Sequence, residues 1–174
     1  MAEGSVTAER VVAVRFRVPP LTARLINRPV TESMTPGYAR LCLQYVGAIC
    51  LRRGTVGLDD FTAAALTDPQ TLALARRLQI IEAGNPDPNA LVPQRVEIDL
   101  AGGRTIACSV DAVLGSPARP LAADAVRAKF ETCWRAVAQL WPEHGVDLWN
   151  AVSALEALED VGVLAALAAP SRGN

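Results

Sequence analysis

The segment 94–111 constrains the fold most, because two runs of alternating apolar and polar residues lie on either side of Gly102 and Gly103. A Gly-Gly pair between such runs is typical of a tight β-turn, since glycine adopts positive φ at little cost. The pattern therefore predicts an antiparallel hairpin. The apolar residues that would share one face of it are Val96, Ile98, Leu100, Ile106, Cys108 and Val110. A lone hairpin is only marginally stable, so other elements have to cover that face.

A second alternating run, residues 9–18, predicts one more strand, which would end at the pair Pro19-Pro20. Its buried face would consist of Val12, Val14, Phe16 and Val18.

Two helices are predicted between this strand and the hairpin. Residues 36–53 are apolar almost all round, which indicates a buried helix that ends at Gly54. With Asp68 as N-cap and Pro69 as first helical residue, a narrow apolar stripe predicts a surface helix that ends at Gly84.

Two more helices are predicted after the hairpin. Residues 121–141 carry apolar side chains at helical spacing before Pro142, and a last helix would run from the N-cap Asp147 to Pro170. The last helix would carry one continuous apolar stripe made of Leu148, Val152, Leu155, Leu158, Val161, Leu164 and Leu167.

The order of these elements is β-α-α-β-β-α-α, which predicts an α+β fold of two layers, with a small antiparallel sheet packed by helices. A chain of 174 residues, 51% of them apolar, can bury such a core without disulfides or metals. We expect a polar leader at residues 1–8, the α+β domain at 9–141, a packing helix at 142–169 and a tail at 170–174.

Charge and hydropathy exclude several partner classes. The formal net charge of −1 gives no electrostatic footprint for nucleic acid or an anionic membrane surface. The longest nearly apolar run, residues 161–169, is too short to span a bilayer. The first ten residues contain two glutamates and no apolar run, so we expect a cytoplasmic protein.

Metal binding and thiol catalysis are not expected. Cys42, Cys50, Cys108 and Cys133 show no C-x-x-C spacing, and His144 is the only histidine. We expect the cysteines to be buried reduced thiols, with no metal ligand, no catalytic residue and no cofactor in this chain.

Several stretches, in order along the chain, resemble the C-terminal part of the MmgE/PrpD family, which includes 2-methylcitrate dehydratase and cis-aconitate decarboxylase. They are the motif Asn27-Arg28-Pro29, residues 39–46, 54–61 and the hairpin 96–105, the loop 115–121, the pair Lys129-Phe130 and the closing residues 158–161.

The resemblance implies a lid domain. Family members carry a helical domain ahead of it, which holds the catalytic histidines, and the active site lies in the cleft between the two domains. Decarboxylase members place a tyrosine two residues before the N-R-P motif, where this chain has Leu25. Leucine has no hydroxyl that could move a proton.

The substrates that the resemblance implies are tricarboxylate-like acids, which need cations to hold their carboxylates. Arg28 and Arg40 lie in matching motifs and are our candidate substrate-binding residues, because a guanidinium binds a carboxylate with two parallel hydrogen bonds. The alternative is that Arg28 anchors a loop and Arg40 is a solvated or ion-paired helix residue.

Other noticeable residues favour structural roles. For Lys129, the only lysine, we expect an aliphatic stem packed over the sheet, and for His144 a surface or helix-capping role. Trp134, Trp141 and Trp149 are interpreted as core or partner-facing aromatics.

The leading functional hypothesis is the stand-alone lid half of an MmgE/PrpD-type lyase, inactive alone and completed by a separately encoded helical domain. The alternative is a non-catalytic remnant of that fold that self-associates or binds small acids. The partners expected are a second copy of the chain or a helical-domain subunit, and a small carboxylic acid as ligand. Whether the chain by itself is an enzyme stays open.

Overall fold

The computed structural model describes residues 6–137 and 144–169. The chain forms two compact units, residues 1–113 and 114–174. The first unit combines a four-stranded sheet with helices, and the described part of the second is helical, so the expectation of an α+β fold is confirmed. The expected boundary at residue 141 and the expected tail 170–174 lie outside the described residues.

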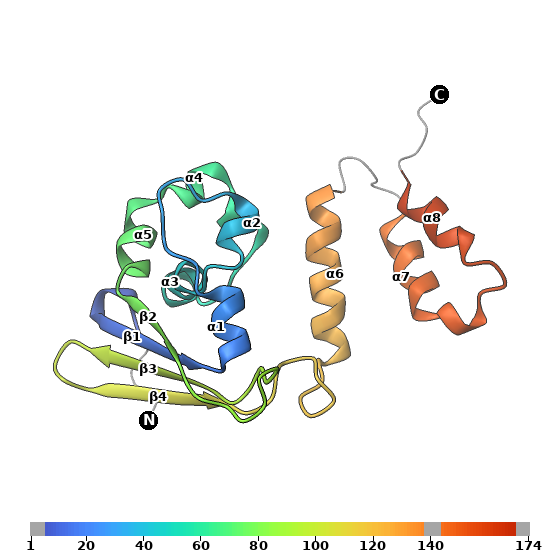
Figure 1. Ribbon diagram of the computed structural model, residues 1–174. Helices are drawn as coiled ribbons and strands as arrows, with labels where there is room; N and C mark the ends of the chain where they lie inside the picture. Colours follow the sequence, from blue (N-terminus) through green and yellow to red (C-terminus); the bar gives the residue numbers. More distant parts are fainter. Residues whose placement is uncertain (1–5, 138–143, 170–174) are drawn as a thin grey trace, which may run out of the picture. The chain divides into compact units, whose positions relative to one another are not determined.

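The first unit contains most of the elements. In chain order they are η1 (Ala8–Arg10), β1 (Val11–Val18), α1 (Pro20–Ile26), α2 (Pro36–Ala39), α3 (Leu43–Arg53), η2 (Leu58–Phe61), α4 (Ala63–Leu66), α5 (Pro69–Ala75), β2 (Leu78–Glu82), β3 (Gln94–Leu100) and β4 (Thr105–Val110). The strand order is β2-β1-β3-β4, and the helices gather on one face of the sheet (Figure 1).

The sheet is mixed, whereas a purely antiparallel one was expected. β1 pairs with β3 and β3 with β4 in antiparallel fashion, but β1 pairs in parallel with β2. A parallel neighbour requires a crossover connection, and the helices α1–α5 supply it.

Strand β2 replaces the end of a predicted helix. Asp68 is indeed the N-cap of α5, its carboxylate accepting from the Thr71 amide at 3.0 Å, but α5 ends at Ala75 and does not reach Gly84. The spacing of Leu72, Ala75, Leu78 and Ile81 fits a helix, yet the segment LQIIE has β-branched residues and gains a full partner in β1.

The face of β1 also differs from the expected alternation at one residue. Val14 and Val18 are buried as predicted, but Val12 is 57% exposed and Val11 is buried. The pairing with β3 shifts register between Val11 and Ala13, and a bulge of this kind turns the following side chain to the opposite face.

The hairpin has the predicted form. Val96 pairs with Cys108 and Ile98 with Ile106, so these apolar residues share one face. Gly102 and Gly103 adopt φ of 95° and 82°, the left-handed region that the Gly-Gly pair predicted.

The predicted helix 36–53 is divided into α2 and α3. Cys42 lies between them in an extended conformation, and its thiol donates to the Arg28 carbonyl at 3.1 Å. α3 ends at Gly54, whose φ is 76°, as the sequence predicted. α3 packs between two hydrophobic clusters, one against the sheet and one among the helices. The sheet-side cluster contains Val11, Val14, Ala48, Leu74, Ala75, Leu78 and Leu100, and the helical cluster Met34, Ala39, Cys42, Tyr45, Ile49, Leu66 and Leu72.

The second unit contains α6 (Ala123–Val137), α7 (Gly145–Ser153), η3 (Leu155–Ala157) and α8 (Gly162–Ala168). The single long last helix was therefore a wrong prediction. Asp160 accepts a hydrogen bond from the amide of Gly162 at 2.7 Å, and such a local bond competes with the helical pattern. Glycine is also a weak helix former, so the apolar stripe is interrupted.

The cysteines were expected to be buried. All are free thiols, but only Cys42 is buried, while Cys50, Cys108 and Cys133 are exposed. Among residues 6–137 and 144–169, no helix has both the length and the hydropathy needed to cross a bilayer.

Candidate functional site

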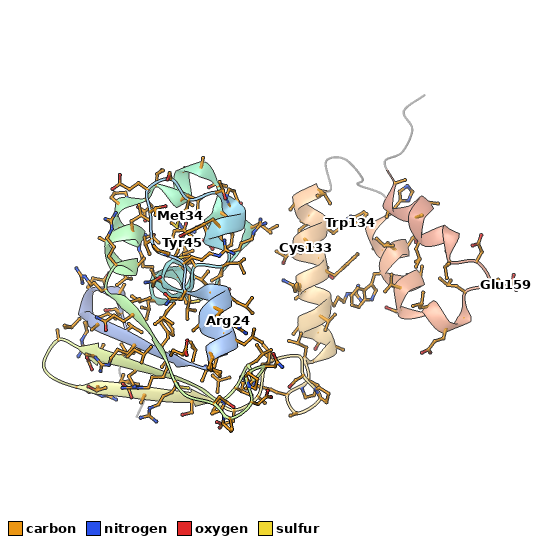
Figure 2. The ribbon with its side chains drawn as sticks, viewed as in Figure 1. Arg24, Met34, Tyr45, Cys133, Trp134 and Glu159 are labelled. Atoms are coloured by element: carbon orange, nitrogen blue, oxygen red, sulfur yellow. The ribbon has the colours of Figure 1, made fainter. Side chains whose placement is uncertain are left out.

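The candidate site is built on the segment that connects α1 to α3, residues 27–42, which contains α2. Several contacts fix its course. The Tyr38 hydroxyl donates to the Pro29 carbonyl at 2.8 Å, and the Cys42 thiol donates to the Arg28 carbonyl. Met34 is buried in the helical cluster together with Tyr45, and both lie within the helical layer of the first unit (Figure 2). The segment is thus an ordered part of the helical layer.

Both predicted substrate-binding arginines lie over aromatic rings. The guanidinium carbon of Arg28 is 5.3 Å from the centroid of the Tyr38 ring, and that of Arg40 is 5.3 Å from the centroid of the Phe61 ring. Contacts of this kind are attractive because the negative face of the ring meets the cation. Tyr38 and Phe61 pack against the same helical cluster, so one apolar cluster supports both arginines.

Neither arginine has a carboxylate partner in the part of the chain that the structure describes. The aromatic rings hold the side chains of Arg28 and Arg40 without neutralising their charge. A cation in this state retains hydrogen-bond donors for an external carboxylate or phosphate.

The support of Arg40 reaches into the core. The Phe61 ring lies 6.2 Å from the ring of Tyr45, and the Tyr45 hydroxyl is 2.7 Å from the Asp60 carbonyl oxygen and 3.0 Å from that of Ala65. Burial raises the pKa of Tyr45, and the nearby Asp60 carboxylate adds to this effect. The hydroxyl therefore stays protonated and acts as a donor that fixes the backbone around Phe61.

The carboxylate of Asp60 completes this support. It accepts from the Gly57 amide at 2.7 Å and pairs with Arg53, and the residue is almost fully buried. Its acceptor capacity is used within the fold, so we assign it a structural role.

Cys42 does not supply a nucleophile to this segment. Burial raises the pKa of its thiol, although the backbone amides of Tyr45 and Gln44 and the charge of Arg28 oppose the shift, and the thiol donates a hydrogen bond to a carbonyl. A raised pKa keeps the sulfur as the unreactive thiol. The segment can therefore bind anions, but no side chain described in it is set up for covalent catalysis.

The other residues noted in the sequence lie elsewhere. Leu25, at the position of the family's tyrosine, lies on α1 and is 49% exposed. Lys129 is exposed on α6, and His144 is the N-cap residue of α7 but makes no side-chain capping bond. Trp141 lies outside the described residues. Within the described residues, no cluster of three or more His, Cys, Asp or Glu side chains could hold a metal ion.

The two aromatic residues that position the arginines, Tyr38 and Phe61, were not predicted from the sequence motifs. Tyr38 comes two residues before Arg40 and ten after Arg28. Phe61 lies on η2, and α3 separates it from Arg40 in the sequence. Only the alternation of aromatic and arginine residues in this region hinted at the pairing, and it does not say which ring meets which cation.

Comparison with known proteins identifies the family. Residues 1–144 match the family described as the MmgE/PrpD C-terminal domain, and the chain therefore belongs to this family. The search of curated proteins found no match. The segments that carry the sequence resemblance lie mostly within residues 1–144, whereas α7, η3 and α8 lie beyond the match.

Proposed function

We propose that this member of the MmgE/PrpD family works as the lid half of a lyase that acts on tricarboxylate-like acids, and that a separately encoded helical domain completes its site. In this proposal the chain binds substrate carboxylates, and the partner domain supplies the groups that move protons. The reaction would take place in the cytoplasm, a reducing compartment that suits four free thiols.

The observation that carries the proposal is the state of Arg28 and Arg40. Each guanidinium is held over a ring at 5.3 Å, and neither has a carboxylate partner in the described residues. An acid with several carboxylates satisfies more than one such cation at once. Holding the substrate in this way also orients it for a base on the partner domain.

The alternative is a non-catalytic remnant that binds small acids or associates with itself. The exposed Leu25 favours it, since this position has no hydroxyl to take part in proton transfer. Both hypotheses share the arginine site, and they differ in whether a partner domain adds catalysis.

The binding step is tested by titrating the purified chain with citrate in a calorimeter. Removing one charge-assisted pair weakens binding about tenfold, so Arg28→Gln and Arg40→Gln should each do so, and together more. Arg95→Gln is the matched control, because Arg95 is exposed on β3 and alternates with the core-facing Val96. Equal citrate affinity in the wild type and the double variant would refute the arginine site.

The catalytic step needs a separate test. The isolated chain should not turn over 2-methylcitrate, citrate or cis-aconitate, whereas a mixture with the histidine-containing helical domain should. A neighbouring reading frame that encodes such a domain is the natural source of the partner. Citrate binding without turnover in the mixture would favour the remnant, and turnover by the isolated chain would contradict the lid-half proposal.

A further inference from the structure

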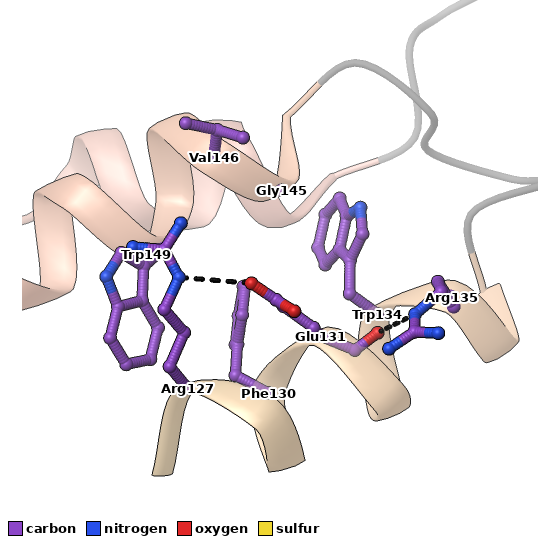
Figure 3. Close-up of a pocket in the computed structure, with 8 residues that line it drawn as sticks. All are labelled: Arg127, Phe130, Glu131, Trp134, Arg135, Gly145, Val146 and Trp149. Carbon is purple, nitrogen blue, oxygen red and sulfur yellow. Dashed lines mark hydrogen bonds and ion pairs between the residues drawn. The ribbon is translucent and has the colours of Figure 1, made fainter. Parts of the chain in front are cut away.

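The second unit contains a cavity between α6 and the beginning of α7, with a volume of about 300 Å³ (Figure 3). Its walls are largely aromatic. The Phe130 ring stacks on Trp134, with centroids 5.9 Å apart and planes at 19°, and meets Trp149 at 5.3 Å and 50°. A cavity of this size is at the lower end of the range for ligand sites, so it fits a small molecule.

The charged residues of the cavity carry a net positive charge. Arg127 donates to the Glu131 carboxylate at 3.0 Å and lies over the Trp149 ring at 5.7 Å. Arg135 uses its Nε to donate to the main-chain carbonyl of Glu131 at 3.2 Å. Within the described residues, no carboxylate pairs with Arg135, so its terminal nitrogens keep their donors.

Further donors lie at the beginning of α7. A Cβ on the buried Gly145 would clash with Nε1 of Trp134, so only glycine allows the indole N–H to come this close to the helix. The indole N–H has no acceptor among the described residues, and the side chain of His144 makes no capping bond to the first amides of α7. The cavity thus combines several unused donors with one carboxylate that is already paired.

We propose that this cavity binds a small aromatic carboxylate, with its ring packed against the aromatic wall and its carboxylate facing Arg135 and the indole N–H of Trp134. Aromatic cages often hold cations, but here the two arginines outnumber the single glutamate and would repel a cation. A neutral aromatic compound would use the rings and leave the donors without an anion.

The cavity is independent of the lid proposal. The family match ends at residue 144, so α7, with Gly145 and Trp149, lies outside it. The proposal needs neither a partner domain nor the arginines of the first unit. Loss of citrate binding at Arg28 would leave it unaffected.

The test uses the indole N–H signals of the ¹⁵N-labelled full chain. The signals of Trp134, Trp141 and Trp149 are assigned with single Trp→Phe variants, and the protein is then titrated with three probes of similar shape: phenylacetate, phenylacetamide and phenethylammonium. We expect phenylacetate to shift the Trp134 and Trp149 signals in a saturable way. Because a hydrogen bond to a charged group is lost, phenylacetamide should bind at least about tenfold more weakly, and phenethylammonium should not saturate.

Variants separate the site from general surface binding. Arg135→Gln should weaken phenylacetate binding about tenfold, whereas Lys129→Gln, which removes an exposed charge from the same helix, should not change it. Gly145→Ala should abolish binding, because the indole has to move away from α7.

The outcomes decide the proposal even if Gly145→Ala fails to fold, because Arg135→Gln tests the same site. Equal affinity for the acid and the amide would overturn the anion site. So would a phenylacetate affinity that is the same in Arg135→Gln and the wild type, or shifts confined to Trp141.

Discussion

Replacing Tyr45 by phenylalanine removes one oxygen atom from the support of the candidate site. The Tyr45 side chain is 1% exposed, and its hydroxyl lies 2.7 Å and 3.0 Å from the carbonyl oxygens of Asp60 and Ala65. Tyr45→Phe keeps the ring and its packing on Phe61, but it removes the one hydroxyl proton that these two carbonyls share, although the Ala65 carbonyl keeps the Asp68 amide at 3.2 Å. A buried group that loses its hydrogen bond costs about 1–3 kcal/mol.

Urea unfolding followed by circular dichroism measures this loss. With a slope of about 2 kcal/mol per molar urea, a loss of about 2 kcal/mol lowers the midpoint by about 1 M while the slope stays constant. Hydrogen exchange should also become faster in residues 58–66, because η2 and α4 lose one of their bonds to α3.

Tyr38→Phe is the matched control, since it removes the same atom from a half-buried ring. The Tyr38 hydroxyl donates to the Pro29 carbonyl at 2.8 Å, but solvent reaches this bond and can replace it. We expect its loss to cost less than about 0.5 kcal/mol. If the two variants lowered the midpoint by the same amount, the buried hydroxyl would not be the anchor inferred here.

Three more perturbations test other parts of the structure. Gly47→Ala places a Cβ 2.8 Å from a methyl carbon of Leu78 and 2.9 Å from the Phe16 ring. This crowding costs about 1–3 kcal/mol, which should outweigh the gain in helix propensity, so we expect the melting temperature to fall. The Thr71 hydroxyl is the main group that lowers the pKa of Asp68 to about 2. The ionised carboxylate therefore stabilises the folded state at pH values above 3.8, the pKa of the unfolded chain, and this contribution is lost as the pH falls toward 2. Asp68→Asn should lose this part of the acid sensitivity in melts recorded from pH 5 to pH 2. Light scattering should report at least twice the chain mass of 18.4 kDa, because α7, η3 and α8 expose Val146, Val152, Leu155 and Val163. A monodisperse monomer would refute the expected self-association.

Short-range signals in the sequence predicted the local structure well. The Gly-Gly turn, the end of α3 at Gly54 and the cap of α5 at Asp68 each depend on one or two residues whose conformational preference is strong. These positions need φ above zero or an acceptor for a free amide, and few residue types supply either.

Signals that depend on tertiary partners were misread. The apolar residues from Leu72 to Ile81 suit a helix, but the second half becomes β2 because β1 offers it a parallel partner. The last helix fails for a local reason, the bond between Asp160 and Gly162, which the apolar stripe hides. Periodicity reports which residues become buried and leaves open which backbone buries them.

The two arginines of the candidate site were predictable from the sequence, but the side chains that hold them were not. The motif around Asn27 pointed to Arg28, and the helix sequence to Arg40, but the rings that hold them come from different elements. A contact between a guanidinium and a ring depends on the path of the chain between them, and that path follows from the packing of the helical cluster.

Two arginines of the first unit, Arg15 and Arg52, have partners unlike those of Arg28 and Arg40. Arg15 donates to Asp99 at 2.6 Å, which raises the pKa of Arg15 further, and Arg52 pairs with Asp68. In these pairs the carboxylate uses the donors and cancels the charge. Such arginines contribute to the fold and have little left to offer a ligand.

Arg28 and Arg40 differ from these pairs, because the rings of Tyr38 and Phe61 restrict their side chains without using the N–H donors. Ordering a guanidinium before the ligand arrives reduces the entropy lost on binding, and its uncancelled charge is directed at the incoming anion. A lysine in either place would keep the charge and lose the planar fork that matches a carboxylate. Arg28→Lys and Arg40→Lys should therefore bind citrate more weakly than the wild type while the melting temperature stays the same, an effect that a purely structural role for these residues would not produce.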